Sequence, residues 1–170
     1  MELAGSGYLY TVALLAMTFV GFCAIVLMFR QGIKHSSRIV LHSHAYIELG
    51  FSAAAFAMLA PLLSACGLPD GQTWRIASIA IAIVMVIQSS RHLNQFVRAF
   101  GTLYPRILVN SAISALVVIG LVANASKYPF EPQLGPVAVA ATWRLVHGAE
   151  IFLLTFEDFF ANPTRARKSK

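Results

Sequence analysis

Apolar residues in this sequence gather in blocks of about twenty, and this feature constrains the fold more than any other. A helix that crosses a hydrocarbon core of about 30 Å, rising about 1.5 Å per residue, needs about twenty mainly apolar residues. Five stretches meet that length without a cluster of charges: residues 8–29, 39–63, 74–90, 104–125 and 137–160. Runs such as residues 76–87 are apolar on every side and lack the alternation of a β-barrel strand. The sequence therefore predicts an all-α, polytopic transmembrane helix bundle with five spans.

The composition excludes an ordinary water-soluble domain. Hydrophobic residues make up 58% of the chain and charged residues only 12%, whereas soluble domains are about a quarter charged. Almost nothing lies outside the five stretches, so residues 1–163 are predicted to form a single transmembrane domain and residues 164–170 a basic cytoplasmic tail. The first span is too long for the apolar region of a secretion signal, and no basic residue precedes it, so we expect it to remain in the mature protein.

The distribution of Lys and Arg predicts the orientation. With the N-terminus outside, only Arg75 and Lys127 fall in outer connections, and Arg144 falls within a span. The others lie on the inner side: Arg30, Lys34, Arg38, Arg91, Arg98, Arg106, Arg165, Arg167, Lys168 and Lys170. By the positive-inside rule the N-terminus is outside and the C-terminus inside, as in a multi-pass protein of a cell inner membrane. The net charge of +6 then indicates contact with anionic headgroups of the lipid bilayer, and no nucleic acid is predicted as a partner.

The connections add two expectations. Residues 67–71 predict a tight turn on the outer side. After the third span, Leu93, Phe96, Val97 and Phe100 repeat at helical spacing, which predicts an amphipathic interfacial segment or an extension of that helix, ended by Gly101. This segment is interpreted either as a connector along the membrane or as a gate or docking surface.

Ionisable residues inside a span cost about 2.5–3.5 kcal/mol each, so they are where function is sought. The second span holds His42, His44 and Glu48, and the fifth holds Arg144, His147 and Glu150, followed by Glu157 and Asp158 at its inner end. Amides and hydroxyls add Ser52, Gln88, Ser89, Asn110, Ser111 and Ser114.

With a helix rise of about 1.5 Å per residue, Glu48 lies about 12 Å and Glu150 about 10 Å from the inner ends of their spans. Gln88 and Asn110 lie at a similar depth. If the second and fifth helices are neighbours, Glu48, His147, Glu150 and Arg144 can form one buried polar cluster. Small residues favour a close approach of these two helices: Gly50, Ala53, Ala54, Ala57, Ala138, Ala141 and Gly148.

Several chemical readings of these residues stay open. A structural reading pairs Arg144 with Glu48 or Glu150 to fix which helices pack together. A metal reading uses His44 with Glu48 and His147 with Glu150, which resemble the carboxylate sites of four-helix di-iron bundles in ligand type only, with the order reversed. A haem reading uses His44, His92 and His147 as axial ligands. No cofactor is predicted, and whether the protein is an enzyme is left open.

Two further features of the sequence are its pair of cysteines and the pattern of residues near the N-terminus. Cys23 and Cys66 lie at different depths, so no disulfide is expected and both are interpreted as packing residues. Residues 7–10 and 16–22 resemble, in a general way, small multi-span proteins of bacterial genomes, and no activity is implied by this.

The leading functional prediction is a small bacterial inner-membrane protein that assembles as a homo-oligomer and conducts an ion or a proton. Its candidate transport residues are Glu48, His44, Arg144, His147, Glu150, Gln88 and Asn110. Because five spans enclose little space, the pore is expected between subunits. The alternatives are a non-catalytic accessory or scaffold subunit of a larger membrane complex, and a haem- or metal-binding redox protein.

Overall fold

The structure, a computed structural model, describes residues 3, 5–29, 37–100, 105–126 and 132–161, with side chains for all of these except 37–41, 99–100 and 157–161. These residues form five α-helices: α1 (Ser6–Phe29), α2 (Ser37–Ala65), α3 (Asp70–Phe100), α4 (Pro105–Ser126) and α5 (Leu134–Ala161). Each helix contains a stretch long and apolar enough to cross a membrane. The predicted helical bundle is confirmed, and the chain has the architecture of a multi-pass membrane protein.

α3 differs most from its predicted span. We predicted a span over residues 74–90, whereas α3 is 31 residues long. Leu93 and Phe96 are half-buried on its final turns, so the segment after the span is an extension of the helix. The hydropathy pattern predicts the end of the span before Arg91, where charged residues begin. The helix continues beyond this point because long charged side chains at its end reach water. Gly101 and the basic tail at residues 164–170 lie outside the described residues.

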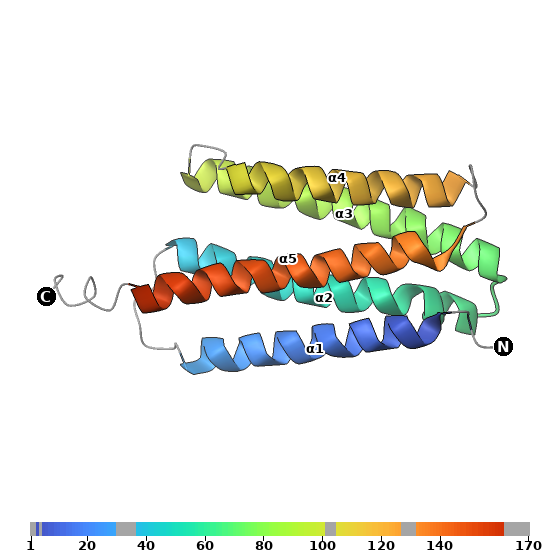
Figure 1. The fold of residues 1–170 in the computed structure, drawn as a ribbon, viewed down its shortest axis with the longest axis horizontal. Helices are drawn as coiled ribbons and strands as arrows, with labels where there is room; N and C mark the ends of the chain where they lie inside the picture. Colours follow the sequence, from blue (N-terminus) through green and yellow to red (C-terminus); the bar gives the residue numbers. More distant parts are fainter. Residues whose placement is uncertain (1–2, 4, 30–36, 101–104, 127–131, 162–170) are drawn as a thin grey trace, which may run out of the picture.

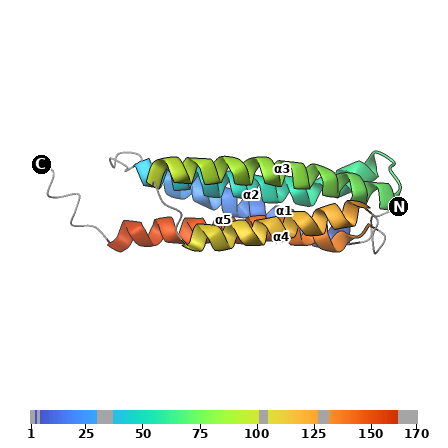
Figure 2. The same ribbon diagram turned by 90° about the horizontal axis from the view of Figure 1, so that it is seen from above.

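α2 and α5 pack against each other along their length and form the centre of the bundle (Figure 1). α1 packs mainly against α2, and α3 pairs with α4 on the opposite side. Figure 2 shows α3 beside α2 and α4 beside α5. The bundle therefore consists of an α1–α2–α5 layer and an α3–α4 hairpin, and no single helix pair across the two contacts as extensively as α2–α5, α1–α2 or α3–α4.

Two glycines allow α2 to approach its neighbours closely. A Cβ added at Gly50 would lie 2.5 Å from Cγ2 of Val20 on α1. A Cβ added at Gly148 on α5 would lie 3.3 Å from Cβ of Leu49 and 3.4 Å from the carbonyl oxygen of Tyr46, both on α2. The close packing of the second and fifth helices is thus confirmed, while Gly50 itself faces α1.

The predicted turn after the second span is present. Gly67 adopts a φ of 87°, a left-handed conformation that glycine reaches without steric cost. Its N–H donates to the carbonyl of Ser64 at 2.9 Å, and the N–H of Leu68 donates to the carbonyl of Leu63 at 3.4 Å. This pair of bonds is a Schellman motif, which satisfies the last carbonyls of α2 and lets the chain reverse into α3.

At the same end of the bundle, the buried side chain of Asn124 joins neighbouring helices through hydrogen bonds. The amide nitrogen of Asn124 donates to Oγ of Ser78 at 2.8 Å and to the carbonyl of Gln133 at 3.0 Å. Its amide oxygen accepts from the N–H of Gln133 at 2.9 Å. Asn124 therefore joins α3, α4 and the residue before α5, and its own polar atoms are satisfied.

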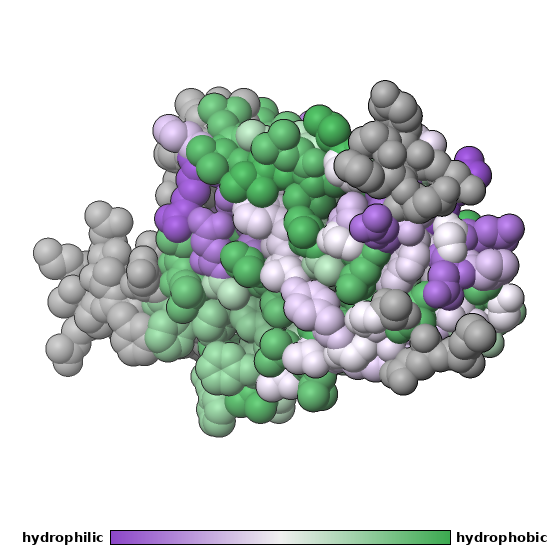
Figure 3. Space-filling view, turned by 45° about the vertical axis from the view of Figure 1, so that its right-hand side comes forward, coloured by the Kyte–Doolittle hydropathy of each residue, from purple (hydrophilic) through white to green (hydrophobic). Residues whose placement is uncertain are grey.

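The outer surface of the bundle is largely apolar (Figure 3). Large hydrophobic side chains are exposed along the helices, among them Leu14, Phe22, Leu116 and Ile119. Such a continuous apolar surface is unfavourable in water and matches a hydrocarbon environment. On the face shown in Figure 3, polar residues (purple) interrupt the apolar surface at both the left and the right of the view.

Candidate functional site: a polar cavity between the two layers

A cavity of about 270 Å³ lies between the α3–α4 hairpin and α5, towards the end of the bundle where α3 ends and α4 begins. The first residues of α2 contribute His42 to its wall. The polar lining residues are His42, Ser89, His92, Arg106, Asn110, Ser111, Ser114, Arg144 and His147. The apolar lining residues are Leu93, Phe96, Ile107, Ile151 and Leu154. This is a site with convergent polar groups set in an apolar frame, as small-molecule sites are.

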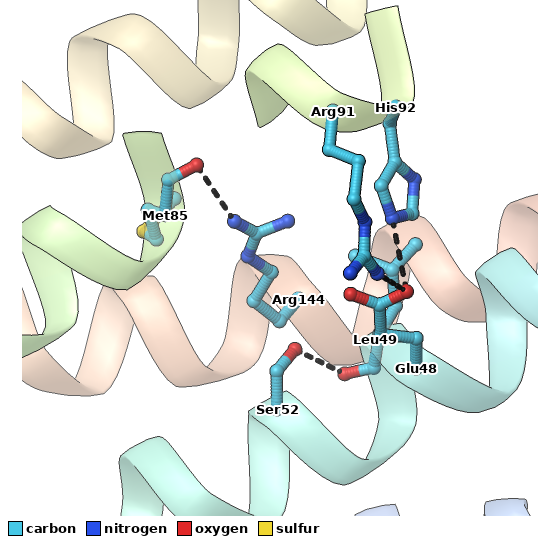
Figure 4. A network of polar contacts seen from close by, with 7 residues as sticks. All are labelled: Glu48, Leu49, Ser52, Met85, Arg91, His92 and Arg144. Carbon is cyan, nitrogen blue, oxygen red and sulfur yellow. Dashed lines mark hydrogen bonds and ion pairs between the residues drawn. The ribbon is translucent and has the colours of Figure 1, made fainter. Parts of the chain in front are cut away.

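Glu48 on α2 is paired with the end of α3 (Figure 4). Its Oε2 atom accepts a hydrogen bond from the guanidinium of Arg91 and lies 3.4 Å from Nε2 of His92. The Arg91 side chain is 54% exposed, so this ion pair lies beside the cavity at its outer edge. The contact ties α2 to the α3–α4 hairpin.

Glu150 on α5 is paired with the start of α4 in a similar way. Its Oε1 atom accepts from Nε of Arg106 at 2.6 Å, and its Oε2 atom accepts from Nδ2 of Asn110 at 3.0 Å. Arg106 is 57% exposed, whereas Asn110 is half-buried and also lines the cavity. The second carboxylate therefore ties α5 to the same hairpin.

Arg144 is the largest fully buried side chain in the described part of the chain, with 2% of its surface exposed. Its Nη2 atom donates to the main-chain carbonyl of Met85 on α3 at 3.3 Å, and its Cζ atom lies 5.9 Å from the centre of the Phe56 ring (Figure 4 draws the first contact). Its Nε atom is buried without a hydrogen-bond partner. Neither the carbonyl nor the ring carries a formal negative charge.

The ion pair of Arg144 with Glu48 or Glu150 that the structural reading required is therefore absent from the described residues. Glu48 is near enough to attract Arg144 at longer range, but it is already bound by Arg91 and His92. Among the described side chains, the cavity and its rim hold three arginines (Arg91, Arg106 and Arg144) and two carboxylates (Glu48 and Glu150); the side chains of Glu157 and Asp158 lie outside the described ones. One positive charge remains in excess, and it belongs to the most deeply buried guanidinium.

Two further polar atoms lack partners near the cavity. His147 lines it with its Nδ1 atom buried and without a hydrogen bond, and its ring stacks on Trp143 at a centroid distance of 5.5 Å. The Oε1 atom of Gln88 is also buried and unpaired. Buried polar groups are normally hydrogen-bonded, to protein, water or ligand. Of these two residues, His147 lines the cavity and Gln88 is not among the lining residues.

The structure brings some of the predicted site residues together and separates others. Arg144, His147 and Asn110 line one cavity, and Glu48 and Glu150 lie at its edges, bound to neighbouring helices. The polar groups thus surround a space instead of meeting in a single cluster. His44 is exposed and is not part of the lining.

Sequence analysis missed the role of Arg91 and Arg106, which we had counted only as inner-loop charges. α3 continues through Arg91, and α4 begins at Pro105, so both arginines stand on helices facing a glutamate. The sequence did contain an indication of these pairs. A carboxylate inside a span, such as Glu48 or Glu150, requires a cationic side chain at a similar depth in the membrane. The pairing itself depends on which helices are neighbours, and a single sequence does not contain that information.

The residues of the metal and haem hypotheses are only partly brought together, since His92 and His147 line the cavity and His44 does not. His44 is exposed, His92 contacts Glu48, and His147 stacks on Trp143. Among the described side chains no group of three or more His, Cys, Asp or Glu residues is arranged to hold a metal ion. Cys23 is buried and Cys66 exposed, both as free thiols.

Comparison of the chain with protein-family models, with curated proteins and with solved structures finds no match. Function is therefore inferred from the geometry of the cavity.

Proposed function

We propose that this protein is a small multi-pass protein of a bacterial inner membrane that transports an ion, and that the ion is an anion bound at Arg144. The observation that carries the proposal is a guanidinium that is 2% exposed, lines a cavity and has no carboxylate partner. A buried charge that lacks a counter-ion is costly. An anion entering the cavity would supply the missing charge and a partner for the unpaired Nε atom.

The carboxylates support an anion over a cation. Glu48 and Glu150 are the acidic groups beside the cavity, and each is already bound to an arginine. Among the described side chains, a cation placed in the cavity would meet Arg144 and no carboxylate that lacks an arginine partner. Glu48 and Glu150 are then better understood as residues that hold the α3–α4 hairpin against α2 and α5.

The proposed orientation places the cavity on the cytoplasmic side, because α2 begins, α3 ends and α4 begins at that end of the bundle. The homo-oligomer also remains a proposal. Since the cavity lies within one chain, binding an anion needs no second copy, whereas a continuous pathway across the membrane can still use one. The mass of the detergent-purified particle measures the number of copies directly.

The test is anion flux into vesicles that contain the purified protein. We propose chloride and methanesulfonate as probes, because neither crosses lipid readily as a neutral acid, with potassium as the cation for comparison. The intact protein is expected to carry at least one of the two anions and not potassium. Arg144→Gln should reduce anion flux to the level of vesicles without protein.

Arg75→Gln is the matched control, since Arg75 is an exposed arginine near the start of α3, at the other end of the bundle from the cavity. Its flux should equal that of the intact protein. Anion flux that persists in folded Arg144→Gln would contradict the assignment of the site. Potassium flux, or no flux of any probe with the intact protein, would contradict anion transport.

A further inference from the structure

The lining of the cavity changes from polar to apolar along its axis. On α5, Arg144 and His147 lie at one end, and Ile151 and Leu154 follow on the same helical face. At about 1.5 Å per residue, Leu154 lies about 15 Å from Arg144, nearer the end of the bundle where α5 ends.

α3 and α4 repeat the same order. On α3, Ser89 lies at the deep end and Phe96 about 10 Å further towards the end of that helix. On α4, Ser114 lies at the deep end and Ile107 about 10 Å nearer its beginning. α3 and α5 thus place polar groups deep in the bundle and apolar groups towards its end, whereas at that same end α4 also contributes the charged Arg106 beside Ile107, and α2 contributes His42. A passage for a hydrated inorganic ion would be expected to be polar along its whole length.

We infer that the cavity binds an amphiphilic carboxylate head first, with the carboxylate at Arg144 and the hydrocarbon part between Phe96, Ile107 and Leu154. This deepens the proposed function, on which it rests, because it names the chemical class of the anion. A guanidinium pairs with a carboxylate through two parallel hydrogen bonds, and the Nε atom of Arg144 is free to donate one of them. The apolar end of the cavity supplies the burial that a small inorganic anion could not use.

The size of the cavity limits the ligand. A volume of about 270 Å³ equals that of about nine water molecules in the liquid. This holds a carboxylate with a short chain, such as hexanoate, in full. A long-chain fatty acid from the membrane is the other source of the same carboxylate group. Hexanoate and palmitate therefore distinguish a small dissolved carboxylate from a lipid-derived one.

Trp143 provides a reporter for binding. Its ring stacks on His147, and its Nε1 atom donates to Oγ of Ser114 at 3.0 Å, so it contacts two lining residues. The other tryptophan, Trp74, can be replaced by Phe to leave a single signal. In detergent, hexanoate should change the Trp143 fluorescence of Trp74→Phe with a saturable dependence on concentration. It should also raise the Tm of the wild-type protein, which keeps the test valid if Trp74→Phe is unstable.

Three comparisons decide the inference. Hexanamide, the uncharged analogue, and acetate, which lacks the chain, should each bind at least about tenfold more weakly than hexanoate. Arg144→Met should weaken hexanoate binding by at least about tenfold, while Arg75→Gln should leave it unchanged. Tighter binding of palmitate than of hexanoate would support a lipid-derived carboxylate of the same class.

Equal binding of hexanoate and hexanamide, or of hexanoate and acetate, would overturn the inference, as would unchanged hexanoate binding by Arg144→Met. These outcomes are separate from the flux test. Chloride flux that depends on Arg144 without hexanoate binding would leave the proposed function standing and reject the amphiphile. Hexanoate binding that depends on Arg144 without flux of any probe would reject transport and leave the binding site.

Discussion

Arg144 on α5 donates its hydrogen bond to the main-chain carbonyl of Met85 on α3, at 3.3 Å, and not to either of the glutamates beside the cavity. A guanidinium held in this way is desolvated without a counter-ion, so it lowers the stability of the unliganded fold. Under the proposed function, an anion bound beside Arg144 offsets this cost.

Arg144→Met is accordingly expected to raise the free energy of unfolding by about 1–3 kcal/mol, because an apolar side chain of similar length removes the unpaired charge. Unfolding in mixed detergent, followed by circular dichroism, measures the difference. If Arg144 served to hold the helices together, the same substitution would destabilise the protein.

Glu150 and Arg106 are expected to interact weakly despite the distance of 2.6 Å between Oε1 and Nε, because Arg106 is 57% exposed and solvent screens the pair. A double-mutant cycle with Glu150→Gln and Arg106→Gln should give a coupling energy of about 0.3–1 kcal/mol. A coupling energy above about 2 kcal/mol would mean that the contact is a fixed part of the core.

Gly50 on α2 is predicted to tolerate enlargement poorly, because an added Cβ lies 2.5 Å from Cγ2 of Val20. Gly50→Leu should lower the free energy of unfolding by about 1–3 kcal/mol through overpacking of α1 against α2. Gly21→Leu on α1 is the matched control, since a Cβ there meets nothing within 4 Å. Equal effects of the two substitutions would contradict the close approach of α1 and α2.

Labelling of the native Cys66 tests the proposed orientation without the introduction of a new cysteine. This residue is exposed just after α2, at the end of the bundle that we propose to face outward, whereas Cys23 is buried in α1. A membrane-impermeant maleimide should label intact spheroplasts at Cys66, and Cys66→Ser should abolish the labelling. Labelling that requires permeabilised membranes would reverse the proposed topology.

The sequence was sufficient for the five-helix architecture, but not for the partners of the polar residues within it. Five apolar blocks predicted five helices because each block has the length of about twenty residues that a helix needs to cross the hydrocarbon core. Small residues such as Gly148 correctly predicted the close packing of α2 and α5, since only small side chains allow it.

The partners of Glu48, Glu150 and Arg144 were not predictable in the same way. The number of residues between a side chain and the end of its span gives its depth along the membrane normal. It does not give the direction in which the side chain points around the helix axis. Glu48 and Glu150 face α3 and α4, and Arg144 faces α3. Because these directions follow from how the hairpin packs against the other three helices, the sequence suggested one cluster where the structure has a cavity with charged edges.

The most direct test of the account is the contact between the ligand and Arg144 itself. Solid-state NMR of protein containing isotope-labelled arginine, with carboxyl-labelled hexanoate, measures the dipolar coupling between the ligand carboxyl carbon and guanidinium nitrogens. We predict a coupling that corresponds to direct hydrogen bonding in the wild-type protein and that disappears in Arg144→Met. Hexanoate that binds without such a coupling, or a coupling that persists in Arg144→Met, would contradict the central claim that the buried arginine receives its counter-ion from a ligand.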